Sequence, residues 1–209
     1  MCFFKNKKHT RQMPSDKYYH ESGHAIITRL FDELFEFELV TVDPELSKRI
    51  DTLSGGGVKG KHKLPVIDRS LFDHDKAVLS YLAGFCVDEL LRIQAIQPQL
   101  LAPAYWVGKL NEDKYSGDRD LIGSTFYPYI DEQTGLLFND YITDCLSALF
   151  KILNDDVIWN CIVSMRESLL KNKTLNLDQV DKVLTESGFN EWKEKNKVRI
   201  EQERIEALD

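Results

Sequence analysis

The feature that most constrains this chain is the run YYHESGHAIITRL at residues 18–30. Its spacing is helical, because a set of residues recurs at steps of four, three and four and therefore shares one face of an α-helix. The Pro-Ser-Asp run at residues 14–16 precedes it and offers side chains that cap free helix amides. The sequence therefore predicts a helix over about residues 15–34 with two histidines on one side. The residues that share the face are His20, His24, Ile27 and Phe31.

Most of the remaining chain also has helical spacing. Residues 35–43 alternate apolar and polar side chains, as a half-buried strand does, and the glycine-rich residues 53–58 fit a turn or an edge strand. We therefore expect a mainly α fold, a helical domain with a small β element beside the histidine helix. Further helices are expected over residues 69–97, 116–128, 133–153, 156–171 and 177–187.

The chain is expected to form one domain. Residues 1–13 are predicted to be a flexible N-terminal lead, residues 14–190 the folded domain, and residues 191–209 a charged C-terminal tail. Residues 92–115 contain prolines and a glycine and are predicted to be an insertion or a loop within the domain.

Composition excludes several classes of protein. A net charge of −7 and a pI near 5.3 argue against a nucleic-acid-binding protein, which normally carries a basic face. No apolar stretch reaches the ~18 residues of a membrane span, and the short apolar run at residues 2–4 is unlike a signal peptide. The four widely spaced cysteines form no CxxC pair and indicate reduced thiols. We expect a soluble cytoplasmic protein without a membrane span.

The HExxH pattern of His20, Glu21 and His24 predicts a zinc site. Histidines at i and i+4 of a helix can hold one Zn²⁺ ion, and the glutamate that follows the first histidine lies beside the water bound to that ion. There it can act as a general base and then as a general acid. A surface helix with incidental histidines is the alternative, and a purely structural zinc site is less favoured because it usually needs four protein ligands.

The residues alone leave the third zinc ligand open. The metzincin pattern is excluded, because Ile27 and Leu30 stand where a glycine and a histidine are required. His74, between two aspartates, fits the polar first turn of a helix better than a metal site. A downstream carboxylate is the better choice, and the candidates are Asp88, Glu89, Asp118 and Asp120.

Several sequence blocks resemble the peptidase domain of the FtsH family, the membrane-bound ATP-dependent zinc proteases. HESGHAII is similar to the HEAGHA motif of that family, and the other blocks follow in the family's order over roughly residues 15–187. The blocks are HESGHAII (20–27), VTVDPE (40–45), LSGGGVKG (53–60), YLAGFCVDELL (81–91), SGDRDLIGST (116–125) and TLNLDQVDKVL (174–184).

This resemblance implies a zinc-dependent metalloendopeptidase that cleaves peptides or unfolded proteins. It implies that His20, His24 and Asp120 bind Zn²⁺ and that Glu21 is the catalytic residue. Glu89 is then an alternative ligand or a group that supports the ligands. Residues 53–58, with Gly55, Gly56 and Gly57, become an edge strand on which a substrate backbone pairs.

The chain departs from the family pattern in two ways. The AAA+ ATPase module and the transmembrane segments that precede the family's peptidase domain are not in this sequence, and the spacing from His20 to Asp120 is longer than expected. We therefore expect action on flexible or already unfolded chains, with a separate ATPase partner and a homo-oligomer left open. The alternative function is an inactive FtsH-peptidase-like domain that binds peptides or partners.

Overall fold

The computed structural model describes residues 17–50, 57–93, 103–131, 135 and 137–197. Within these ranges the fold is mainly helical with one small antiparallel sheet, as the sequence predicts. In chain order the elements are α1 (Lys17–Leu30), β1 (Phe35–Thr41), α2 (Pro44–Ser47), β2 (Val58–His62), the 3₁₀ turn η1 (Val66–Asp68), α3 (Leu71–Ile93), α4 (Pro103–Leu110), the 3₁₀ turn η3 (Asp113–Tyr115), α5 (Ser116–Thr125), the π-helical segment η4 (Phe126–Asp131), α7 (Phe138–Leu153), α8 (Asp156–Asn172), β3 (Thr174–Asn176) and α9 (Leu177–Glu186).

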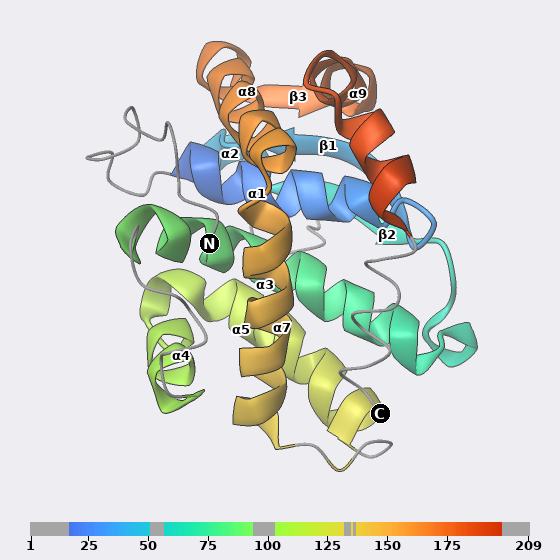
Figure 1. The fold of residues 1–209 in the computed structure, drawn as a ribbon, viewed down its shortest axis with the longest axis vertical. Helices are drawn as coiled ribbons and strands as arrows, with labels where there is room; N and C mark the ends of the chain where they lie inside the picture. Colours follow the sequence, from blue (N-terminus) through green and yellow to red (C-terminus); the bar gives the residue numbers. More distant parts are fainter. Residues whose placement is uncertain (1–16, 51–56, 94–102, 132–134, 136, 198–209) are drawn as a thin grey trace.

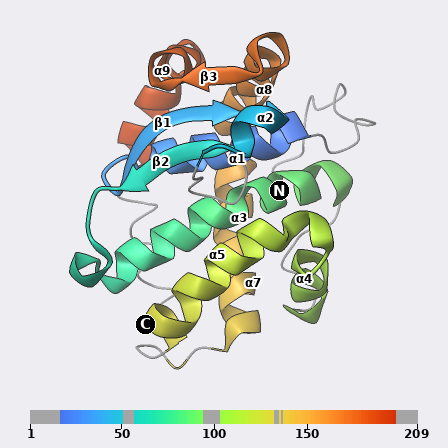
Figure 2. The ribbon, with the colours of Figure 1, turned by 180° about the vertical axis from the view of Figure 1, so that it is seen from behind.

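The sheet has the strand order β2-β1-β3, and both pairings are antiparallel. Val40 in the central strand lies opposite Val58 on one side and Leu175 on the other, and all three are buried. The expected strand at residues 35–43 is confirmed as β1, although it ends at Thr41. Because β1 occupies the centre, β2 forms one edge of this sheet, and Figure 2 shows it lying over α1.

Helices α1 and α3 pack closely against each other. Gly23 lies at the contact, because a Cβ there would lie 2.8 Å from the carbonyl oxygen of Ala83 and 2.8 Å from a methyl carbon of Val87. Helix α8 covers another side of α1, while α5 and α7 pack on α3 (Figure 1). The helix that carries the two histidines therefore lies in the interior of the domain, with one side against α3.

The segment predicted as an insertion or loop packs into the domain where the structure describes it. Helix α4 packs on α7, and Trp106 and Leu110 are buried in the core. The following turn η3 buries Tyr115, so residues 103–115 contribute to the core and deliver a residue to the site described below. Large apolar side chains at helical spacing explain why the described part forms a packed helix in place of a loop.

The described part of the predicted charged C-terminal tail, residues 191–197, packs against the domain. Residues 189–197 are helical, and Trp192 is buried. The amine of Lys193 donates a hydrogen bond to the carbonyl oxygen of Arg29 at 3.1 Å and pairs with Asp32 at 2.7 Å. The packed domain therefore extends past residue 190. The predicted N-terminal lead, residues 1–13, lies outside the described residues.

The described residues bear on two expectations from composition, one about membrane-spanning helices and one about the cysteines. No helix within the described ranges is long and apolar enough to cross a membrane. Cys86, Cys145 and Cys161 are buried free cysteines, as the spacing of the cysteines predicts. Burial raises the pKa of the Cys86 thiol well above its usual value, which favours the neutral, unreactive form.

Candidate metal centre

Helix α1 brings the two histidines of the HExxH pattern together. The Nε2 atoms of His20 and His24 lie 3.1 Å apart, and the rings meet edge to face. His24 is fully buried, whereas the His20 side chain is 14% exposed. Of the two rings, the His20 ring is therefore the one that is partly exposed to solvent.

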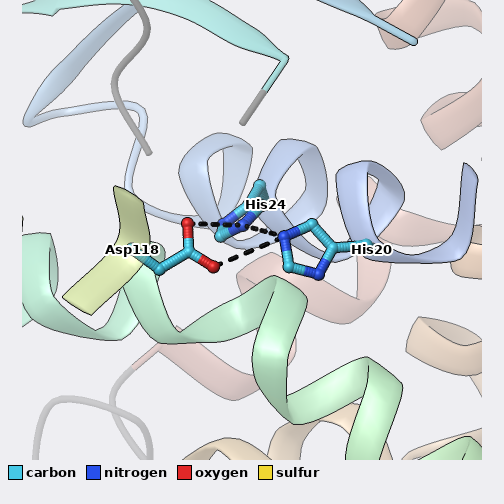
Figure 3. Close-up of side chains that lie close together, drawn as sticks. All are labelled: His20, His24 and Asp118. Carbon is cyan, nitrogen blue, oxygen red and sulfur yellow. Dashed lines mark hydrogen bonds and ion pairs between the residues drawn. The ribbon is translucent and has the colours of Figure 1, made fainter. Parts of the chain in front are cut away.

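Asp118 at the start of α5 completes a cluster with the two histidines (Figure 3). One carboxylate oxygen, Oδ2, lies 3.4 Å from Nε2 of His20, and the other, Oδ1, lies 3.5 Å from Nε2 of His24. The carboxylate is buried, and its Oδ2 atom has no hydrogen-bond partner among the described residues. Two nitrogen atoms and one carboxylate thus face a common point, contributed by two helices.

The structure corrects the third ligand that the resemblance implies. Asp120 lies in the same helix as Asp118, but its side chain is 77% exposed and its carboxylate is 3.7 Å from the guanidinium of Arg119. Two residues along an α-helix turn the side chain by about 200°, so only one of the two aspartates can face α1. Asp118 shares its face with Tyr115, Ile122 and Thr125, which are buried. That apolar spacing is the signal that distinguishes it from Asp120.

Nδ1, the ring nitrogen of each histidine that faces away from the shared point, also has a hydrogen-bond partner. Nδ1 of His24 lies 2.8 Å from the carbonyl oxygen of Ser80, and Nδ1 of His20 lies 3.2 Å from Oδ2 of Asp88. A carbonyl and an ionised carboxylate only accept hydrogen bonds, so each Nδ1 carries the proton. In the neutral rings each Nε2 then presents its lone pair to the shared point, which is the arrangement typical of metal-binding histidines.

The carboxylate that supports a histidine is Asp88, in place of Glu89. Asp88 also accepts a hydrogen bond from the Tyr115 hydroxyl at 3.1 Å, which links the segment after α4 to the site. Glu89 is buried as well, but its carboxylate pairs with the guanidinium of Arg92 and is not part of the cluster. Gly84 in α3 lies against the two histidine rings. Asp88 is four residues later and so shares the helix face of Gly84, whereas Glu89 points elsewhere.

His74, which the sequence places in the first turn of a helix, is not part of the cluster either. Its ring stacks on Tyr129 with ring centroids 4.2 Å apart.

Electrostatics couple the members of the cluster. Burial alone would lower the pKa of His20, but its contacts with Asp118 and Asp88 outweigh burial and hold that pKa well above its usual value. Burial alone would raise the pKa of Asp118, but the two histidines lower it. These contacts therefore favour the charged forms of both His20 and Asp118. A metal ion would compete with the proton of His20 for the same site.

The side chain of Glu21 extends from α1 toward Gly57, which directly precedes β2. Its Oε2 atom accepts a hydrogen bond from the backbone N–H of Gly57 at 2.6 Å, and its charge helps to raise the pKa of His20. The carbonyl oxygen of Gly57 in turn accepts a hydrogen bond from the N–H of Thr41, and a Cβ at Gly57 would overlap the Thr41 carbonyl oxygen. The structure therefore brings Gly57 to the site. Gly55 and Gly56 lie outside the described residues.

The cluster could hold a metal ion, and two observations test the fit. A tetrahedral ion with bonds of 2.0–2.1 Å places its ligand atoms about 3.3–3.4 Å apart. The two Nε2 atoms lie 3.1 Å apart, Oδ2 of Asp118 lies 3.4 Å from Nε2 of His20 and Oδ1 lies 3.5 Å from Nε2 of His24, so each of these pairs is near that spacing. Taken as one ligand atom from each residue, the set lies within 4.8 Å of one another. The buried oxygen of Asp118 that lacks a hydrogen bond is then accounted for as a ligand. The residues present fit a small divalent ion.

No protein-family model, no curated protein and no solved structure matches this chain.

Proposed function

We propose that this protein is a zinc-dependent metalloendopeptidase that cleaves unfolded or flexible polypeptides. One observation carries the proposal: His20, His24 and Asp118 converge on one point, and Glu21 follows the first histidine in the same helix. Two imidazoles and one carboxylate form a ligand set that zinc accepts readily. Three protein ligands leave a fourth position open, as in catalytic zinc sites, whereas structural sites are closed by four.

His20, His24 and Asp118 would hold the zinc ion, which would supply Lewis-acid polarisation of the peptide carbonyl and of the attacking water. The residues of the chain do the remaining work. Glu21 accepts the proton of the attacking water and then gives it to the leaving amine, as a general base and acid. The N–H of Gly57 holds the Glu21 carboxylate in place through its 2.6 Å hydrogen bond. Asp88 and the carbonyl of Ser80 hold the two imidazole rings in the tautomer that the site requires.

The edge strand β2 is the surface that we propose for the substrate. It pairs with β1 on one side, and it begins one residue after Gly57, whose N–H contacts Glu21. An extended peptide that pairs along the other side of β2 would therefore pass close to the general base. This mode of binding favours chains without structure of their own, because only an extended backbone can add to a sheet edge. A separate ATPase that unfolds substrates and a homo-oligomer stay predictions.

The test uses purified protein, its metal content and an unfolded substrate. Elemental analysis should find about one zinc per chain, as one centre of three protein ligands requires. Casein should be cleaved by the zinc-loaded protein and left intact by Glu21→Gln, with Glu36→Gln as a matched control on the exposed face of β1. If wild type binds zinc but is as inert as Glu21→Gln on a panel of unfolded substrates, the alternative of a peptide- or partner-binding module is favoured. If wild type binds no zinc after supplementation, the metallopeptidase proposal fails.

A further inference from the structure

Gly84 lies in the interior of α3, directly opposite the metal-binding face of α1. A glycine in the middle of a helix is unfavourable, because alanine favours the helical state more. Positive φ does not explain it: the glycines of the described residues with positive φ are Gly135 and Gly188. The reason for a glycine at this position must therefore lie in the space in front of it.

That space is bounded by the two metal-binding rings. A Cβ built at Gly84 would lie 2.6 Å from Nε2 of His20 and closer still to Nε2 of His24. The third nearest atom is Cε1 of His20, at 2.7 Å. The contrast with Gly23 is clear, since a Cβ at Gly23 would meet the backbone oxygen of Ala83 and the Val87 side chain. Gly23 permits the two helices to approach, whereas Gly84 leaves room beside the ligand atoms.

We propose that Gly84 is a further residue of the metal centre and that it acts through the Cβ it lacks. A methyl group at this position would force both rings away from their common point. It would also take up space beside the two Nε2 atoms, where the ion would be held. Ring displacement is further opposed by the Nδ1 hydrogen bonds to Ser80 and Asp88. This inference rests on the proposed metal site. It identifies the space in front of Gly84 as space that the two rings and the ion need.

The test is a zinc titration of Gly84→Ala against wild type. Affinity is measured by competition with a chromophoric chelator, and Co²⁺ absorption reports the ligand geometry independently of any activity. Gly108→Ala is the matched control, because Gly108 also lies in a helix and a Cβ there would meet nothing within 4 Å. We expect Gly84→Ala to lose at least about 100-fold in zinc affinity, the upper end of what outer-shell changes cost, with near-native circular dichroism, and Gly108→Ala to bind as wild type does.

Each other outcome also decides the matter. Binding by Gly84→Ala as tight as by wild type would overturn the role of Gly84 and leave the proposed function intact. If wild type binds no zinc, both proposals fall together. If Gly84→Ala does not fold, it is combined with His20→Ala and His24→Ala, which remove both rings. Recovery of folding in that combination shows that the methyl group clashes with the rings alone, as we infer, and continued unfolding overturns the inference.

Discussion

The Glu21 carboxylate is held by the backbone of Gly57, whose N–H lies 2.6 Å from Oε2. This hydrogen bond ties the residue that we propose as the general base to the sheet edge that we propose as the substrate surface. The same hydrogen bond makes glutamine a suitable substitution at position 21, because only the acid–base role is then removed. A glutamine at position 21 keeps an oxygen that can accept from Gly57, but it cannot take a proton from water.

Glu21→Gln should therefore lose catalysis and keep the site. General acid–base groups contribute typically 10²–10⁴-fold to a rate, so we expect kcat on an unfolded substrate to fall by roughly that factor. Zinc affinity and thermal stability should stay close to wild type, because the three proposed ligands are unchanged. The measurements are peptide cleavage and zinc content of the same preparation. Cleavage by Glu21→Gln at the wild-type rate would assign the general base elsewhere.

Asp118→Asn and Asp120→Asn form a pair that tests the third ligand. Asparagine at 118 removes the buried negative charge that faces both histidines, so zinc affinity should fall by more than the roughly 10–100-fold that loss of an outer partner costs. The same change at the exposed Asp120 should leave affinity within about twofold of wild type, since its carboxylate contacts none of the described histidines. Both are measured by chelator competition. Reversed results would return the ligand role to Asp120.

The two aspartates also show how far the sequence alone can lead. The helical spacing around His20 and His24 predicts their shared face, because that spacing is a local property of the helix. Which carboxylate joins them depends on how α5 packs against α3, and packing is not a local property. Asp118 falls on the buried face of α5 with Ile122, and this spacing of buried residues distinguishes it from Asp120. The order of motif blocks points instead to Asp120, which lies on the exposed side of the helix.

Other elements show the same contrast between features that local spacing predicts and features that depend on long-range packing. The strand at β1 is predicted by its alternation, but β3 is too short to show a pattern and forms because α8 and α9 bring Leu175 beside Val40. Residues 92–115 contain helix-breaking residues and are predicted as an insertion or a loop, yet residues 103–110 form α4. The described part packs because Trp106 and Tyr115 are large enough to bury substantial apolar area. In both cases long-range contacts decide what local propensity leaves open.

Asp88→Asn and Glu89→Gln separate support of the metal from support of the fold. The change at position 88 weakens the acceptor for Nδ1 of His20, so zinc affinity should fall by roughly 10–100-fold, as for other carboxylate–histidine–zinc arrangements. Glu89→Gln breaks the ion pair with Arg92 and should lower thermal stability with little change in zinc affinity. Zinc titration and thermal unfolding of the metal-free proteins provide the two readouts. A larger affinity loss from Glu89→Gln would contradict the assignment of Asp88.

His62 predicts a pH dependence of stability that is separate from the metal centre. Burial, with help from Arg69 and His74, lowers the pKa of His62 to about 4, and its Nε2 lies 2.9 Å from the Tyr81 hydroxyl. An unfolded histidine titrates near 6.5. Between these values the unfolded chain takes up a proton that the folded chain does not, so this residue lowers the free energy of unfolding as the pH falls from about 6.5 toward 4.

The measurement is urea unfolding of the metal-free protein at pH 7 and pH 5, for wild type and His62→Gln. The substitution costs some stability at pH 7, because it removes the ring that packs on Phe35. It also removes the group that must stay neutral, so the variant should lose less stability than wild type between pH 7 and pH 5. A chelator in every sample keeps the metal centre out of the comparison. Parallel pH profiles for the two proteins would show that His62 titrates in the folded state much as it does in the unfolded chain.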